Sequence, residues 1–234
     1  MDLDFYQTAY FSAGLFYFAI WLALFFLRKD VHKQMLVVGL FLIGTAPINI
    51  IWHWDYWHPP YIFGNIFPFE DFFWGFAFAG VVAVAYEVIF RIRLKMSYRH
   101  CVKEIARELC ILLGIIVSTL LVLSNIFHLN SIYAISVGLI LVVWYMHTKR
   151  PDLMRDMFWS GIFSVVFVFI FYVVWQYPYP GVFERFWNMD AISGILILGI
   201  PLEELVWFFL AGMFVGPLYE FVTGAKVEKI KNCG

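Results

Sequence analysis

The sequence predicts an all-α integral membrane protein with seven transmembrane helices in two parallel three-helix repeats. Hydrophobic residues make up 63% of the 234 residues and charged residues only 14%, whereas soluble domains are about a quarter charged. The apolar residues form long blocks rather than alternating or amphipathic stripes, which is typical of membrane-spanning helices. A pattern that occurs twice along the chain predicts the repeats. Together these observations indicate a multi-pass protein of the cell membrane.

The apolar blocks set the expected spans, since about 20 residues are needed for a helix to cross a bilayer. Seven blocks are long enough: 6–27, 35–53, 69–90, 109–127, 131–147, 157–177 and 194–222.

Basic residues predict the orientation, because cytoplasmic loops are enriched in Lys and Arg. Of the 16 basic residues, 15 lie after spans one, three, five and seven, and only Arg185 lies on the other side. We therefore expect the N-terminus outside and the C-terminus in the cytoplasm.

A twenty-residue pattern occurs at 68–87 and again at 201–220, 133 positions later. The identical pairs include Pro68 and Pro201, Glu70 and Glu203, Trp74 and Trp207, Val82 and Val215, Tyr86 and Tyr219, and Glu87 and Glu220. Each copy begins a span that runs from outside to inside, so two three-helix units share one orientation and an extra helix must join them. We expect units at 1–95 and 131–234, with a basic loop and linker helix at 96–130.

The paired carboxylates at the start of each copy are the candidate catalytic residues. Acids in a first turn can simply complement the helix dipole, but Glu203 and Glu204 have no polar flank for several residues on either side. Acidic groups inside an apolar protein are costly and indicate function. A carboxylic acid kept from water can hold a proton at neutral pH and donate it. We expect Glu203 and Glu204 to be the principal acid/base pair, with Glu70 and Asp71 second.

The loops before each copy are crowded with Trp, Tyr and Pro. They can form an interfacial aromatic belt or line a pocket whose ring faces stabilise a cation. The second interpretation predicts these substrate-binding residues: Trp54, Asp55, Trp74, Trp187, Asn188 and Trp207. The pairs Tyr86-Glu87 and Tyr219-Glu220 lie about 25 Å further along each helix, where we expect interfacial anchoring.

Several classes of site have no support in the sequence. The net charge of −1 does not indicate the positively charged surface that binds nucleic acid. His53 and His58 have no third ligand at a suitable spacing, so no metal site is expected. Nucleotide, flavin and zinc-hydrolase motifs do not occur, and no cofactor is expected.

The duplicated Pro-x-Glu-acid pattern, with an aromatic helix after it and a Trp-Asp or Trp-Asn loop before it, resembles the membrane lycopene cyclase family. The similarity is to the fused single-chain form of the heterodimeric bacterial, archaeal and fungal-type carotenoid cyclases. PLEELVWFF at 201–209 is close to the family pattern, whereas PFEDFFWGF at 68–76 carries Asp71 as its second acid. Asn188 departs from the acid that the first half has at Asp55.

The resemblance implies a cofactor-free, redox-neutral cyclisation of a long-chain carotenoid taken from the bilayer. An acid would protonate the terminal double bond of a ψ end group, a six-membered ionone-type ring would close, and a base would remove a proton. The ring type, β, γ or ε, stays open. Two alternatives also stay open, a cyclase of another polyprenoid and a SWEET-like small-solute transporter. The last span has no lysine for a retinal Schiff base.

Overall fold

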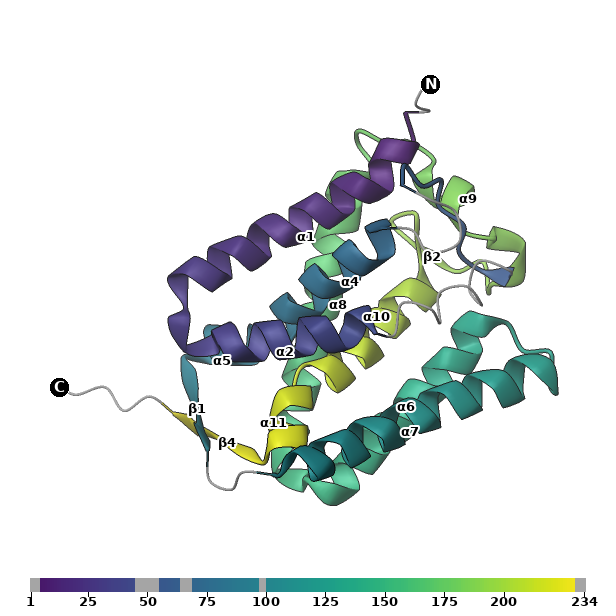
Figure 1. The fold of residues 1–234 in the computed structure, drawn as a ribbon. Helices are drawn as coiled ribbons and strands as arrows, with labels where there is room; N and C mark the ends of the chain where they lie inside the picture. The colour runs from purple at the N-terminus through teal and green to yellow at the C-terminus, as the bar shows by residue number, and fades with distance from the viewer. Residues whose placement is uncertain (1–4, 45–54, 64–68, 97–99, 230–234) are drawn as a thin grey trace.

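The computed structural model describes residues 5–44, 55–63, 69–96 and 100–229. Long helices dominate it, with two short two-stranded sheets (Figure 1). Six helical segments are long and apolar enough to cross a membrane: 7–27, 69–90, 102–125, 131–149, 151–175 and 202–223. They confirm a multi-pass membrane protein. The predicted span 35–53 begins as α2 (His32–Ile43), and its remainder lies outside the described residues.

The first half of the chain contains three long packed helices. Its elements are α1 (Gln7–Leu27), η1 (Lys29–Val31), α2 (His32–Ile43), α4 (Phe69–Val82), α5 (Ala85–Phe90) and β1 (Ile92–Met96). Helix α4 packs against both α1 and α2. The corner between α1 and α2 is held by an ion pair of 3.0 Å between Arg28 and Asp30.

Helix α6 (Val102–Asn125) follows the first half and leads into the second, which has a similar plan. The elements of the second half are α7 (Ser131–Lys149), η3 (Pro151–Leu153), α8 (Met154–Trp175), α9 (Val182–Phe186), η4 (Met189–Ala191), β2 (Leu196–Ile197), β3 (Ile200–Pro201), α10 (Leu202–Val215), α11 (Leu218–Thr223) and β4 (Ala225–Lys229). Helix α10 packs against α8 and α7, while α6 lies along α7 and contacts α11. An ion pair of 2.7 Å between Arg150 and Asp152 holds the corner between α7 and α8.

Corresponding helices and strands of the two halves begin and end 133 positions apart, the same spacing as the sequence pattern. Helices α4 and α10, α5 and α11, and strands β1 and β4 are each 133 positions apart at both ends. In both halves the long helix is interrupted, at 83–84 and at 216–217. Pro217 explains the second break, because proline lacks the N–H that an uninterrupted helix would use. Strands β1 and β4 pair with each other, antiparallel, with Leu94 opposite Val227.

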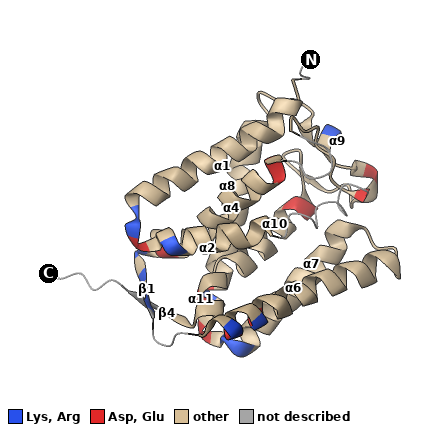
Figure 2. Cartoon of the chain, viewed as in Figure 1, with Lys and Arg blue, Asp and Glu red and all other residues tan. Residues whose placement is uncertain are grey.

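Charge is unevenly distributed along the molecule. Figure 2 shows Lys and Arg gathered mainly around the corner of α1 and α2, β1, and the start of α6, with one basic position at α9. This distribution follows the predicted orientation. The orientation itself, the 3+1+3 repeat and the domain limits remain predictions.

Two predicted helix starts are wrong. Helix α6 begins at Val102, not 109, because its polar first turns are still helical: the Glu104 side chain accepts from the Cys101 backbone N–H at 2.7 Å and caps the start. The last span begins at Leu202, not 194. Residues 196–201 instead form the β2–β3 hairpin, whose turn uses Gly199 at φ 84°.

Helices α8 and α10 approach closely through small residues. A Cβ atom placed on Gly212 would lie 2.6 Å from the Ser164 Cβ and 2.9 Å from the Gly161 Cα. Any larger residue at this position would force the helices apart. Small residues at such crossings are typical of membrane helix packing, where backbone contact replaces hydrophobic burial as the driving force.

Candidate active site

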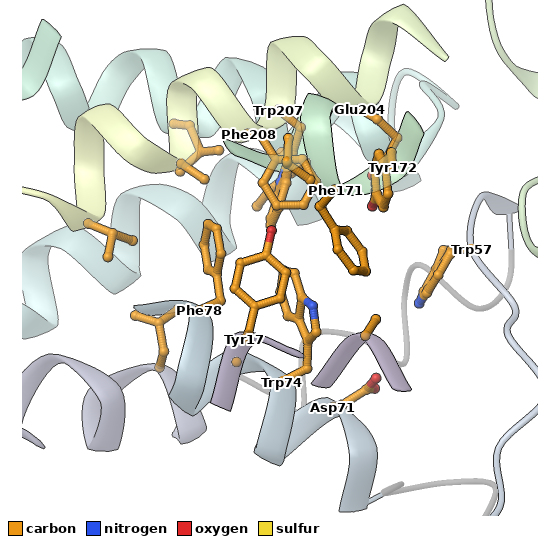
Figure 3. Close-up of a pocket in the computed structure, with 18 of the residues that line it drawn as sticks. Tyr17, Trp57, Asp71, Trp74, Phe78, Phe171, Tyr172, Glu204, Trp207 and Phe208 are labelled. Carbon is orange, nitrogen blue, oxygen red and sulfur yellow. Dashed lines mark hydrogen bonds between the residues drawn. The ribbon is translucent and has the colours of Figure 1, made fainter. Parts of the chain in front are cut away.

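A cavity of about 160 Å³ lies where α1, α4, α8 and α10 meet. Asp71 on α4 and Glu204 on α10 both line it, 133 residues apart in sequence. Figure 3 shows the two carboxyl side chains on opposite walls with aromatic side chains between them. The structure therefore brings together one acid from each half of the chain.

The other two predicted catalytic acids, Glu70 and Glu203, are not among the cavity-lining residues. The reason is helix geometry. Neighbouring residues of an α-helix point about 100° apart, so the two acids of a pair point in different directions, and hydrogen bonds to the preceding loop hold Glu70 and Glu203 away from the cavity. The second acid of each pair faces inward, and the first turns towards the loop before the helix.

Glu204 is buried and accepts three hydrogen bonds. The Tyr56 hydroxyl and the Trp187 indole N–H donate to Oε1 at 2.6 and 2.9 Å, and the Tyr172 hydroxyl donates to Oε2 at 3.0 Å. Burial and the Glu204 charge raise the pKa of the Tyr56 hydroxyl well above its ordinary value, so this residue stays a proton-bearing donor. Three donors hold the carboxyl group in one orientation towards the cavity.

Two loops cooperate to bring these donors to Glu204. The His58 N–H donates to the Phe186 carbonyl at 2.8 Å, and the Asn188 N–H donates to the Tyr56 carbonyl at 2.9 Å. These backbone hydrogen bonds pair the loop before α4 with the segment after α9. The pairing places Tyr56 from the first half and Trp187 from the second half on the same carboxyl oxygen.

Asp71 has hydroxyl partners of its own. The Tyr10 hydroxyl donates to Oδ1 at 2.8 Å, and the Tyr61 hydroxyl contacts both carboxyl oxygens at 3.2 and 3.3 Å. Burial, with the Asp71 charge as a further cause, raises the pKa of Tyr61 above its ordinary value. Both cavity acids are thus held by phenol groups that keep their protons.

Glu70 and Glu203 instead bind the backbone of the loops before them. Glu70 accepts from the N–H groups of Ile62 and Phe63 at 2.7 and 3.0 Å. Glu203 accepts from the Ser193 N–H and the Tyr133 hydroxyl, both at 2.8 Å. The corresponding acids of the two halves therefore have the same kind of contact, and that contact fixes the loop against its helix.

Aromatic rings form much of the cavity wall. Trp74 stacks on Phe78 at a centroid distance of 4.8 Å, and Tyr17 meets Trp74 edge-on at 5.7 Å. Trp207 and Trp187 contribute from the second half. The volume is of the order that accommodates a small ring hydrocarbon such as benzene.

The remaining predicted binding residues lie elsewhere. Trp54 is outside the described residues. The Asp55 carboxylate accepts from the Ser131 N–H at 2.7 Å and from the Ser131 hydroxyl, so it caps the start of α7. The Asn188 side chain donates to the Asp55 carbonyl at 3.3 Å. Asp55 and Asn188 therefore connect the two loops and α7 and do not line the cavity.

Four tyrosines of the site were not expected from the sequence: Tyr10, Tyr56, Tyr61 and Tyr172. Tyr10 and Tyr172 lie in the middle of apolar runs where tyrosine is ordinary, and only the helix packing shows which hydroxyls meet an acid. Helical periodicity shows from the sequence that Glu203 and Glu204 point in different directions, but not which of them faces the cavity.

Comparison with known proteins gives one finding. Residues 130–222 match the family model described as Lycopene cyclase, a segment that runs from the cap of α7 into α11 and includes Glu203 and Glu204. None of the curated proteins and none of the solved structures matches the chain. The family match supports the membrane lycopene cyclase family, and with it an enzyme of carotenoid cyclisation.

Proposed function

We propose that this chain, whose residues 130–222 match the lycopene cyclase family, closes the ψ end groups of a linear carotenoid into rings with Asp71 and Glu204 as its acid/base pair. The observation that carries the proposal is the placement of these two buried carboxyl groups on opposite walls of one aromatic-lined cavity. A hydrocarbon substrate has no polar group to bind, so shape and the two acids must supply recognition and chemistry.

The proposed reaction needs one proton in and one proton out. One of the two carboxylic acids donates its proton to the terminal double bond, which leaves a tertiary carbocation. The neighbouring double bond attacks this cation and closes a six-membered ring, which moves the positive charge into the ring. The other carboxyl group, as carboxylate, removes a ring proton and restores the double bond. The product is an isomer of the substrate, and no cofactor is consumed.

The aromatic wall is suited to protect the cation between the two proton transfers. Ring faces stabilise a nearby cation by about 0.5–2 kcal/mol each, more when water is excluded. Trp74, Trp207 and Phe78 line the same cavity as the two acids, and Figure 3 shows Phe171 between the acids. Exclusion of water also prevents its addition to the cation, which would give an alcohol in place of a ring.

The phenol and indole donors have a positioning role in this proposal. They hold each carboxyl group in place while it changes protonation state, so little reorganisation accompanies the proton transfer. Tyrosine hydroxyls can donate to a carboxylate or accept from a carboxylic acid. The same partners therefore serve both protonation states of Asp71 and Glu204.

We further propose that the polyene tail lies between α2 and α6. Leu42 and Leu113 belong to the wall of the central cavity. Phe41, next to Leu42 on α2, and Leu109, one turn before Leu113 on α6, line a second, mostly apolar cavity of about 440 Å³. Together the two cavities offer an apolar path for a chain too long for the central cavity alone.

The path has a direct test. Leu109→Trp should lower lycopene conversion by filling the second cavity, whereas Leu121→Trp on α6, an exposed position outside both cavities, should leave conversion unchanged. Equal conversion by both variants at equal membrane abundance contradicts the path.

Pigment analysis tests the function itself. The chain is expressed in bacteria that accumulate lycopene, and carotenoids are separated by chromatography with absorption spectra and mass. A product of unchanged mass and blue-shifted absorption is the expected result, and its retention identifies the ring. Unchanged lycopene, with folded protein present in the membrane, refutes lycopene as the substrate.

A further inference from the structure

A second group of acids lies far along the helices from the cavity. Glu87 on α5, Asp156 on α8 and Glu220 on α11 are 1%, 2% and 0% exposed. One carboxyl oxygen from each lies within 4.8 Å of the other two. These residues correct the expectation of interfacial anchoring for Glu87 and Glu220, because both side chains point into the protein.

The partners of these carboxyl groups are too few for three buried charges. Both oxygens of Glu87, Oδ2 of Asp156 and Oε2 of Glu220 are buried and accept no hydrogen bond of good geometry from the described residues, although the Gln34 and Glu220 side chains lie beside Glu87. This differs sharply from Glu204, which has three donors. Burial of unpaired carboxylates is strongly unfavourable, so a group like this needs either a bound cation or bound protons.

Arg28 interacts electrostatically with Glu87, but the nearby basic side chains form their ion pairs with other acids. Arg28 is paired with Asp30 and Arg150 with Asp152. Arg150 reaches Glu220 only at its backbone carbonyl, at 3.1 Å. Within the described part of the chain, none of the ion pairs involves an acid of this group.

An amide from a fourth helix completes the group. Gln34 on α2 is 2% exposed, and its Nε2 donates to Glu220 Oε1 at 2.8 Å and to the Ala83 carbonyl. Its own Oε1 is buried without a partner among the described residues. The amide is thus oriented by two acceptors and leaves one more unused oxygen beside the three acids.

The four residues come from corresponding places in the two halves. Glu87 and Glu220 are 133 positions apart, in α5 and α11. Gln34 and Asp156 each lie six residues after the arginine of a corner ion pair, Arg28 or Arg150. The group thus joins the two halves where both long helices are interrupted.

From the orphaned oxygens we infer that Glu87, Asp156 and Glu220, with the Gln34 amide beside them, bind a hard divalent cation such as Mn²⁺ or Mg²⁺. The donors are all oxygen, and carboxylate and amide oxygens are the ligands that these cations prefer. A cation here would neutralise buried charge and connect α5, α8 and α11. Its role would be structural, and it is independent of the proposed cyclase activity.

Metal content and thermal stability of the purified, detergent-solubilised chain test this site. We expect about one Mn²⁺ per chain by elemental analysis after incubation and desalting, and a Tm that falls by about 5 °C or more when EDTA removes the ion. Glu87→Gln, Asp156→Asn and Glu220→Gln should each lose the ion and the EDTA effect.

Glu108→Gln is the matched control, since Glu108 is a buried acid on α6 with partners of its own, Tyr145 at 2.8 Å and Arg107 at 2.9 Å. It should keep the ion. A wild-type chain that binds no Mn²⁺ or Mg²⁺ and whose Tm is unaffected by EDTA overturns the inference, as does equal binding by the three variants. Protons shared among the acids would then account for the group. Neither outcome depends on whether lycopene is cyclised.

Discussion

The cavity acids and the cluster of Glu87, Asp156 and Glu220 are all buried carboxyl groups, but they differ in the hydrogen bonds that they receive. Glu204 in the cavity is buried and receives three hydrogen bonds from phenol and indole groups. Glu87 lies on α5, beyond the break that ends α4; it is buried and receives no hydrogen bond of good geometry from the described residues. Donors allow a carboxyl group to change protonation state in place. A carboxyl group without donors needs a counter-ion or a proton, which suits a fixed structural site.

The largest expected effect comes from removing the cavity acids. Asp71→Asn and Glu204→Gln should each lower ring formation by about 10²-fold or more, the usual contribution of a general acid or base. The measurement is product per unit of membrane protein in lycopene-accumulating cells. Retained activity in both variants contradicts the acid/base assignment.

A smaller loss is expected when one donor to Glu204 is removed. Trp187→Phe keeps the ring but deletes the N–H, and a hydrogen bond to a charged group is worth about 1.5–3 kcal/mol, so activity should fall by about tenfold or more. Trp159→Phe, on α8 and outside the cavity lining, is the control. Equal activity of the two variants would show that the indole acts only by shape.

The first acid of each pair should matter less than the second. Glu203→Gln and Glu70→Gln weaken a loop contact, so we expect a lower Tm and a loss of activity below about tenfold, in line with a net hydrogen-bond contribution near 1 kcal/mol. Thermal unfolding and conversion are measured side by side. A loss at Glu203 as large as that at Glu204 would restore the adjacent pair that the sequence predicted.

The smallest effect on cyclisation is expected from the distant group. Glu87→Gln should leave lycopene conversion close to that of the wild type while it changes metal content and Tm. Initial rates at a temperature well below the Tm separate activity from stability. A strong loss of conversion at unchanged stability would join the two regions functionally and remove the contrast between them.

The sequence by itself determined the class of protein and pointed to the acids proposed for its chemistry. The long apolar blocks indicate a helical membrane protein, because the backbone N–H and C=O groups of a span in lipid form their hydrogen bonds within that span when it is helical. The duplicated Pro-x-Glu-acid pattern identified Glu70, Asp71, Glu203 and Glu204, and the resemblance to the lycopene cyclase family agrees with the match over residues 130–222.

Only the tertiary structure decided which acids share a cavity or a cluster. Sequence proximity favoured Glu203 with Glu204, but in the structure Glu203 accepts from the Ser193 N–H and the Tyr133 hydroxyl, and of the two only Glu204 lines the cavity. Helix packing then sets Asp71 opposite Glu204 and brings Asp156 to Glu87 and Glu220. These pairings join residues 64 to 133 positions apart. They depend on how helices pack, through contacts such as Gly212 against Ser164, and no local pattern encodes that.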